Sequence, residues 1–420
     1  MIAPAAARTA IWVICLIATA GVIVRPFRLP EALWAVAGAL LLVILGLVSP
    51  GLASAAIGKG ADVYLFLIGM MLLSETARQE GLFDWVAVHA VNAARGSTAR
   101  LFALVFGVGV VVTTFLSNDA TAVVLTPAVY AAARKARADP LPMLFACALI
   151  ANAASFVLPI SNPANLVLYG GHMPPLGAWL ASFTLPSVAA IGATFVALRL
   201  VERDRLSGVC ERSIEPVALS NGGAIALGGI IVTAVVLVAV SAFDIALGLP
   251  TCVAGVVTTA IVCVGGRQSP APILRGVSWS VLPLVAGLFV LVEALVSTGL
   301  IDTLAAALRS AAAHSVPAAA ALSGTLLAFV SNLMNNLPAG LIASTTIAAA
   351  VPPRLVTDAL LIGVDLGPNL SITGSLATIL WLTAIRREGL DVGFWRFLKV
   401  GAATMPPALI LALGVRIALG

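Results

Sequence analysis

The sequence predicts an all-α polytopic membrane protein built from two inverted repeats, each with five transmembrane helices and one re-entrant hairpin. An apolar composition, an internal repeat and an uneven distribution of cations predict this fold class. Of the 420 residues, 61% are hydrophobic and only 10% are charged, whereas soluble domains carry about 25% charged residues. Since a soluble protein needs polar side chains over its surface, we expect this chain to lie in lipid.

The internal repeat relates residues 66–86 to residues 284–304. A single constant offset pairs Gly69 with Gly287, Glu75 with Glu293, Gly81 with Gly299 and Asp84 with Asp302. Two further matches follow in the same order at slightly shorter offsets: Ser117-Asn118 with Ser331-Asn332, and residues 161–168 with residues 373–380. Matches that keep their order along the chain indicate a duplicated unit.

The first repeat is predicted to span residues 1–200. Apolar runs long enough to cross a bilayer predict spans near residues 9–24, 31–49, 61–78 and 176–200, and residues 82–94 form an amphipathic stretch. Ser117-Asn118-Asp119 interrupts the long apolar segment 100–133, which we expect to be a hairpin. Pro159 and Pro163 break the helix predicted at 141–169, because proline lacks an N–H and clashes with the preceding turn.

A charged linker at 201–221 separates this unit from the second repeat, residues 222–420. The second repeat has the same order: spans near 222–242, 249–266 and 278–297, an amphipathic stretch at 302–313, a hairpin at 317–347, a broken helix at 354–385 and a final span at 394–416. Its hairpin is interrupted near 331–336, and its broken helix contains Gly367, Pro368 and Gly374.

Two re-entrant hairpins leave five crossings in each repeat. Five is odd, so the repeats have opposite orientations, as in secondary transporters. If the linker is cytoplasmic, 18 of the 23 Lys and Arg residues lie inside, and those outside are Arg8, Lys59, Arg309, Arg354 and Arg416. This asymmetry follows the positive-inside rule. We therefore expect a bacterial inner-membrane protein with both termini in the periplasm.

The four interruptions are the predicted substrate site. Inside hydrocarbon, non-helical backbone persists only within protein or beside water. A single Ser-Asn motif could equally hold helices together, but matched pairs in inverted repeats favour a site. The predicted substrate-binding residues are Ser117, Asn118, Ser161, Asn162, Asn165, Ser331, Asn332, Asn335, Asn336, Thr373 and Ser375.

Two carboxylates lie within apolar segments. A carboxylate at membrane depth is costly and indicates function, so Asp119 and Asp365 are the predicted proton-coupling residues. The alternatives stay open: Asp119 could cap the hairpin tip by accepting backbone N–H groups, and Asp365 could be structural. We expect Glu75 and Glu293 to be structural, because both lie at span ends.

Several function classes are excluded. The five cysteines show no metal-ligand spacing and are expected to be packing residues. No Walker motif or Ser/His/Asp arrangement is present, so we expect neither ATP hydrolysis by this chain nor another enzymatic activity, and no cofactor. The net charge of +5 does not indicate nucleic-acid binding, because the cations are distributed between apolar segments.

The interruptions also carry a family resemblance. SNDATAVVLTPAV at 117–129, SNPANLV at 161–167, SNLMNNLPAGLIA at 331–343 and DLGPNLSITGSLATILWL at 365–382 resemble the ArsB family of arsenical-resistance permeases, within the ion transporter superfamily. The resemblance implies an elevator-type fold, export of arsenite and antimonite in exchange for protons, hairpin Ser-Asn residues at the substrate and, in some members, a soluble ATPase subunit. Elevator transporters are often homodimers.

The predicted chemistry agrees with this resemblance. Near neutral pH both metalloids are mostly neutral trihydroxides, which need hydrogen-bond donors and acceptors such as Asn and Ser rather than an Arg clamp. We expect every Lys and Arg to lie outside the site. The alternative is a sodium-coupled dicarboxylate or sulfate carrier, or a sodium/proton antiporter, on the same fold.

Overall fold

The first half of the chain consists of helices of unequal length. The computed structural model describes residues 4–170, 173–243 and 245–420. The helices of the first half are α1 (Pro4–Val24), α2 (Glu31–Ile44), α3 (Pro50–Lys59), α4 (Ala61–Gln79), α5 (Leu82–Ala94), α6 (Thr98–Phe115), α7 (Asn118–Ala120), α8 (Thr126–Lys135), α9 (Leu141–Ala153), α10 (Pro163–Tyr169) and α11 (Leu176–Val201). A π-helical turn, Thr121–Leu125, joins α7 to α8, and 3-10 turns occupy Pro26–Arg28 and Pro159–Ser161.

The second half repeats this order after the short linker helix α12 (Arg203–Leu206). Its helices are α13 (Asn221–Ala242), α14 (Gly248–Gly266), α15 (Ala271–Gly276), α16 (Val281–Val296), α17 (Leu300–His314), α18 (Val316–Met334), α19 (Asn336–Ala350), α20 (Arg354–Leu366), α21 (Leu376–Arg387) and α22 (Phe394–Leu419). A 3-10 turn, Gly367–Leu370, follows α20.

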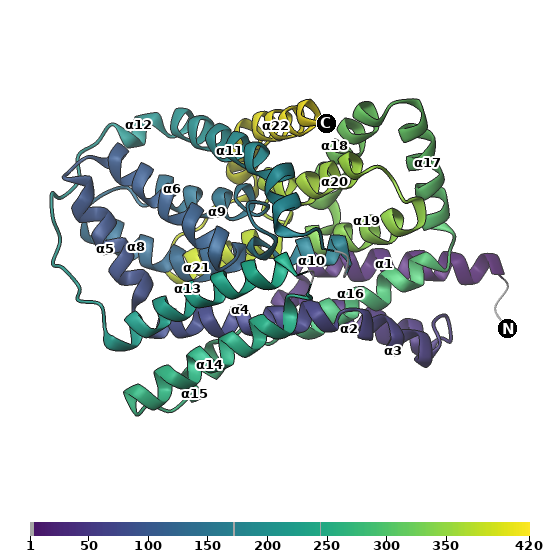
Figure 1. The fold of residues 1–420 in the computed structure, drawn as a ribbon, viewed down its shortest axis with the longest axis horizontal. Helices are drawn as coiled ribbons and strands as arrows, with labels where there is room; N and C mark the ends of the chain where they lie inside the picture. Colours follow the sequence, from purple (N-terminus) through teal and green to yellow (C-terminus); the bar gives the residue numbers. More distant parts are fainter. Residues whose placement is uncertain (1–3, 171–172, 244) are drawn as a thin grey trace.

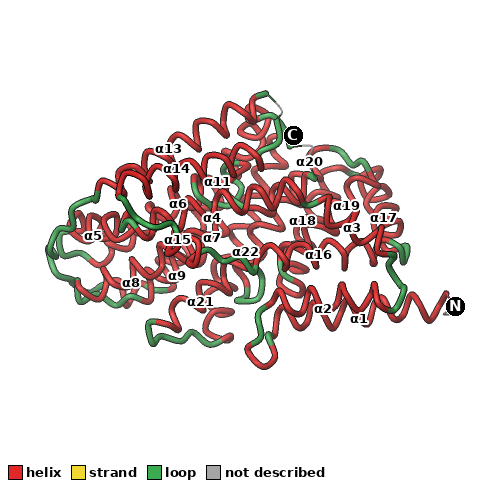
Figure 2. Tube along the Cα trace, turned by 90° about the horizontal axis from the view of Figure 1, so that it is seen from below, coloured by secondary structure: helices red, strands yellow, loops and turns green. Residues whose placement is uncertain are grey.

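The predicted fold class, an all-α polytopic membrane protein, is confirmed. Figure 2 shows helices joined by loops, and the described residues contain no strand. Seven described helices are long and apolar enough to cross a bilayer, and two bent pairs, α3 with α4 and α16 with α17, raise the number to nine. The inverted orientation of the halves stays a prediction.

Capping signals explain why equivalent helices begin at equivalent residues. Gly81 and Gly299, which the repeat offset pairs, both have left-handed backbone, with φ of 73° and 83°. Glycine adopts this conformation without steric cost, so the chain turns there into the amphipathic helices α5 and α17. Ser97 and Ser315, at the same offset, cap the hairpin helices α6 and α18 by accepting an N–H from the third following residue.

The two halves are interlocked by close helix crossings. Helix α4 packs against α14 of the other half, and α16 packs against α2. At both crossings a repeat-matched glycine allows the close approach: a Cβ on Gly69 would lie 2.2 Å from the Thr251 carbonyl oxygen, and a Cβ on Gly287 would lie 2.8 Å from the backbone of Ala35. Small residues are the usual means of close packing between membrane helices.

The long helices run along the long axis of the molecule, and the two hairpins lie toward its opposite ends (Figure 1). Helices α5, α6 and α8 lie at one end with linker helix α12, and α17, α18 and α19 lie at the other; the same separation holds in Figure 2. The broken helices α9–α10 and α20–α21 lie between the hairpins. This arrangement brings interruptions from both halves into the middle of the molecule.

Candidate functional site

The tip of the first hairpin is a short polar turn between α6 and α7. Ser117 has a φ of 148°, and its hydroxyl caps α7 by accepting the Ala120 N–H at 3.4 Å. The Asn118 amide oxygen accepts the Asp119 N–H at 2.9 Å. The tip is braced further by a 2.8 Å hydrogen bond between the Thr113 and Thr121 hydroxyls. Ser117 and Asn118 are buried, whereas Asp119 is half-buried.

The capping alternative for Asp119 receives no support from these contacts. Ser117 and Asn118 already accept the tip N–H groups, and no described residue donates a hydrogen bond to the Asp119 carboxylate. That carboxylate instead borders a cavity of about 50 Å³. Its side chain is therefore available to solvent or a solute.

Elements of both halves line the same cavity. Helix α4 contributes Ser74 and Glu75, the turn before α16 contributes Ser278, and α10 contributes Pro163 at its first residue. A water takes about 30 Å³ in the liquid, so this cavity holds one or two waters. The site brings together the first hairpin tip, residues of both broken helices, α4 of the first half and the segment from α15 to α16 of the second half.

Glu75, which we expected to be structural, lines this cavity. Its carboxylate accepts two hydrogen bonds from Arg78, at 2.8 and 2.5 Å, and a third from Gln79 at 2.8 Å. No described Lys or Arg lines the cavity, although Arg78 binds one of its lining residues. In the sequence, the signal that Glu75 could belong to the site was its match to Glu293 in the repeat. Glu293 also forms an ion pair, with Lys59 at 2.6 Å.

The second hairpin breaks after its Ser-Asn dipeptide rather than at it. Helix α18 continues to Met334, so Ser331 and Asn332 are still helical, and Asn335 forms the break. The offset that relates Gly81 to Gly299 also relates Ser117 to Asn335. The structural equivalents of Ser117-Asn118 are therefore Asn335-Asn336. The match between the Ser-Asn dipeptides was misleading, because they agree in sequence but occupy different positions relative to the helix end.

Ser331 and Asn332 bind backbone. The Ser331 hydroxyl donates to the Leu327 carbonyl at 2.8 Å. The Asn332 amide donates to the Ala328 and Gly367 carbonyls, each at 2.8 Å, and its oxygen accepts the Ser371 hydroxyl at 2.8 Å. Asn332 therefore fastens α18 to the interruption of the second broken helix.

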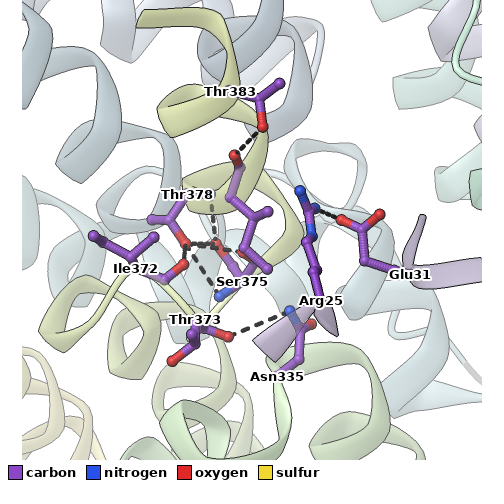
Figure 3. A network of polar contacts seen from close by, with 9 residues as sticks. Arg25, Glu31, Asn335, Ile372, Thr373, Ser375, Thr378 and Thr383 are labelled. Atoms are coloured by element: carbon purple, nitrogen blue, oxygen red, sulfur yellow. Dashed lines mark hydrogen bonds and ion pairs between the residues drawn. The ribbon is translucent and has the colours of Figure 1, made fainter. Parts of the chain in front are cut away.

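The second hairpin tip is closed onto that interruption (Figure 3). The Asn335 amide donates to the Thr373 carbonyl at 3.5 Å, and the Asn336 N–H donates to the Gly374 carbonyl at 2.9 Å. Thr373 also donates its hydroxyl to the Asn332 carbonyl at 3.2 Å. Ser375 caps α21 by accepting the Thr378 N–H at 3.1 Å. None of these predicted residues borders the cavity at Asp119.

Asp365 connects the broken helices of the two halves. One carboxylate oxygen accepts the Asn162 amide at 2.8 Å, and the other is buried without a described hydrogen-bond partner. Nearby, Asn165 donates to three carbonyls of its own interruption, at 2.9–3.4 Å. Ser161 donates to the Thr114 carbonyl of the first hairpin at 3.0 Å. These residues hold the interruptions in place.

A second buried carboxylate escaped the sequence analysis. Asp358 in α20 accepts two hydrogen bonds from Arg416 of α22, at 2.9 and 2.8 Å, and one from the Tyr169 hydroxyl at the end of α10, at 2.7 Å. The described residues contain no group of three or more His, Cys, Asp or Glu side chains placed to hold a metal ion.

The chain is similar to known transporters over most of its length. Residues 13–385 match the CitMHS family, described as citrate transporters. The arsenical pump membrane protein of Escherichia coli K12 is 28% identical over 391 residues, which cover 90% of each chain. That of Yersinia enterocolitica is 29% identical, covering 82% of this chain and 83% of the relative. An uncharacterized transporter of Mycobacterium tuberculosis is 27% identical, covering 93% and 94%.

A solved structure shows the same fold. The Alcanivorax borkumensis YdaH transporter superposes with a TM-score of 0.57 at 16% identity, and the match covers 87% of this chain and 86% of that one. The crystal structure of that protein was described as having an unusual topology. At this identity, the likeness concerns the fold alone.

Proposed function

Because the chain belongs to the CitMHS family of membrane transporters, in the ion transporter superfamily, we propose that it exports arsenite and antimonite from the cytoplasm in exchange for protons. The relatives named arsenical pump membrane protein support this choice of substrate. Export of this kind confers metalloid resistance. The function is that of a carrier rather than an enzyme.

The composition of the cavity carries the proposal. Its polar lining consists of the hydroxyls of Ser74, Ser117 and Ser278 and the carboxylates of Glu75 and Asp119. Hydroxyls both donate and accept hydrogen bonds, and carboxylates accept them from O–H groups. A neutral trihydroxide of arsenic presents three O–H groups, each of which can pair with this lining.

The same lining disfavours an anionic substrate. A carboxylate or sulfate ion needs cationic or multiple N–H partners. The cation nearest to the lining, Arg78, is held by two hydrogen bonds to Glu75. Asp119 would repel an anion at the hairpin tip. A sodium-coupled dicarboxylate or sulfate carrier, or a sodium/proton antiporter, is therefore the second candidate.

Proton exchange is assigned to Asp119, with Asp365 as the second acid. Asp119 borders the cavity, so a proton and a metalloid hydroxyl can compete for the same carboxylate. Asp365 has one oxygen bound to Asn162 and one without a described partner, which a proton can occupy. Exchange follows if loading the solute requires release of the proton.

The test is accumulation of radiolabelled arsenite or antimonite by everted membrane vesicles under an imposed pH gradient, with and without sodium and with citrate as competitor. We expect gradient-driven accumulation that needs no sodium and resists citrate. Accumulation that requires sodium, or none at all, overturns the proposal. Asp119→Asn should abolish gradient-driven transport, whereas Asp302→Asn, which alters an exposed carboxylate on α17, should not.

The membrane placement is part of the proposal. The linker helix α12 and the starts and ends of the first hairpin lie at one end of the long axis (Figure 1), which we assign to the cytoplasm on the distribution of cations. Both termini are then periplasmic, and a phosphatase fused to Gly420 should be active. A soluble ATPase subunit and a homodimer remain expectations from the resemblance.

A further inference from the structure

A second cavity lies outside the solute site, between the first hairpin and the following half. It has a volume of about 720 Å³ and is formed by α5, α6 and α13. Every lining residue is apolar or glycine, from Leu82 on α5 through Ala103 to Leu116 on α6 and Leu227 to Val235 on α13. A cavity of this size and composition has no place for a polar solute.

This second cavity is a groove along α6, and its walls are continuous with the lipid-facing surface. Val111 and Phe115 on α6 are 57% and 40% exposed, and Ile231 and Val235 on α13 are 55% and 62% exposed. From Ala103 to Leu116 the groove follows α6 for about 20 Å, at a rise of about 1.5 Å per residue. One leaflet of a bilayer has about 15 Å of hydrocarbon, so the groove is long enough for an acyl chain.

The end of the groove near the start of α6 is basic. Arg100 lies on the helix face that lines the groove, because residues 100, 104, 107, 111 and 115 follow the helical spacing of three or four. Arg95 is exposed in the preceding turn, and the side chain of Arg212 lies over Gly96, where a Cβ would be 3.1 Å from its Cγ. The ion pairs described at this end join Arg137 to Glu211, Arg203 to Asp204, and Arg205 to Asp139 and Glu202, and none of them includes Arg95, Arg100 or Arg212.

We propose that this groove binds one phospholipid with an anionic headgroup, its phosphate at Arg100 and an acyl chain between α6 and α13. A basic rim above a long apolar groove matches the two chemistries of such a lipid. The deep end of the groove is formed by Phe115 and Leu116, directly before Ser117. The bound chain therefore supports the hairpin that carries Asp119, whichever solute is transported.

Two glycines provide a matched test. Gly107 faces the groove and Gly192 lies on α11 away from it; both are exposed, mid-helix, and a Cβ on either would meet no atom within 4 Å. Gly107→Leu therefore fills the groove without a protein clash, and Gly192→Leu makes the same change elsewhere. Arg100→Gln removes the cation at the rim.

The full-length protein would be purified in mild detergent, stripped of lipid, and titrated with phosphatidylglycerol or phosphatidylcholine while bound lipid is counted by native mass spectrometry. We expect one tightly bound phosphatidylglycerol in the wild type and in Gly192→Leu, and loss of most of it in Gly107→Leu. Arg100→Gln should weaken phosphatidylglycerol binding about five-fold, the effect of one interfacial cation, and weaken phosphatidylcholine binding less, because its choline cation offsets the charge of its phosphate.

Thermal unfolding of each variant in the same detergent confirms that it is folded. Equal retention of phosphatidylglycerol by Gly107→Leu and Gly192→Leu overturns the proposed site. Equal affinity of the wild type for the two lipids overturns the role of the basic rim. Because the readout is bound lipid, failure here is distinguishable from failure of the transport proposal.

Discussion

Removal of Arg416 is expected to destabilise the protein strongly, because it separates a buried ion pair. Arg416 and Asp358 are 4% and 0% exposed, and Arg416 donates two of the three hydrogen bonds to the Asp358 carboxylate. Arg416→Met leaves that carboxylate buried with Tyr169 and with Arg354, whose Nε lies 3.6 Å away. The remaining partners cannot replace a two-point ion pair.

The magnitude follows from this inventory of partners. Removing one partner of a buried ion pair costs about 3–5 kcal/mol, because an uncompensated charge stays buried. Since Tyr169 and Arg354 remain, we expect a value near the lower end, about 3 kcal/mol. Asp358→Asn combined with Arg416→Met should recover at least half of the loss, because both charges are then absent.

The assay is equilibrium unfolding in mixed micelles with increasing sodium dodecyl sulfate, followed by tryptophan fluorescence. Trp179 lies 5.7 Å from Tyr169, ring centre to ring centre, and so reports on this region. Arg354→Met is the control: Arg354 is 45% exposed and approaches the carboxylate only to 3.6 Å, so its removal should cost less than that of Arg416. A loss for Arg416→Met no larger than that for Arg354→Met would refute the reasoning.

Three further predictions concern the helix contacts and the two interruptions. Gly69→Ala should cost about 1–3 kcal/mol of unfolding free energy, because its Cβ would lie 2.2 Å from a backbone oxygen. Gly58→Ala, whose Cβ would have no atom within 4 Å, should not destabilise the protein, and equal effects of the two changes would contradict the close crossing. Asn335 has φ 73° and ψ 153°, so Asn335→Gly should be more stable than Asn335→Ala by about 1–3 kcal/mol in thermal or detergent unfolding, and the reverse order would exclude strain at the tip. Asp365→Ala should cost about 1–3 kcal/mol of unfolding free energy by leaving the Asn162 amide unpaired, and Asp365→Asn should cost less. Transport assays then show whether Asp365→Asn keeps proton coupling, and full coupling would make Asp365 structural.

Much of the fold was predictable because membrane helices leave a strong local signal. Apolar length predicted most of the spans, although α2, Glu31–Ile44, is shorter than the span expected at 31–49. Gly81 and Gly299 marked equivalent helix starts through a conformation that glycine favours. The position of the second hairpin break was not predictable from the Ser-Asn dipeptide. A helix end depends on backbone partners, and those of Asn335 and Asn336 lie in the distant segment around Thr373.

The candidate site was predictable only in part, because the partners of its residues come from distant segments of the chain. Polar residues within apolar segments pointed to Asp119, which is half-buried, and to Asp365, which is buried, and their role in proton coupling stays a prediction. The neighbours of these groups come from distant elements: Glu75 and Ser278 reach the cavity of Asp119 from α4 and the turn before α16. Asp358 and Arg416 are far apart in the sequence, and each lies near a span end, where a charge is normally solvated. Only the packing of α20 on α22 reveals their ion pair.

The asymmetry of the two hairpins bears on how a duplicated chain can transport. The first tip faces a cavity with an acid that has no described protein partner, while the second tip donates its amide and backbone N–H groups to the interruption of the broken helix in its own half. Elements that the repeat pairs therefore occupy different environments in one structure. The chemistry is unequal as well, because the second tip carries Asn336 and Leu337 where the first carries Asn118 and Asp119. If the proposed proton exchange takes place, the first hairpin tip offers a carboxylate for it and the second does not, so we expect coupling to depend on the first hairpin even if both hairpins open during the cycle.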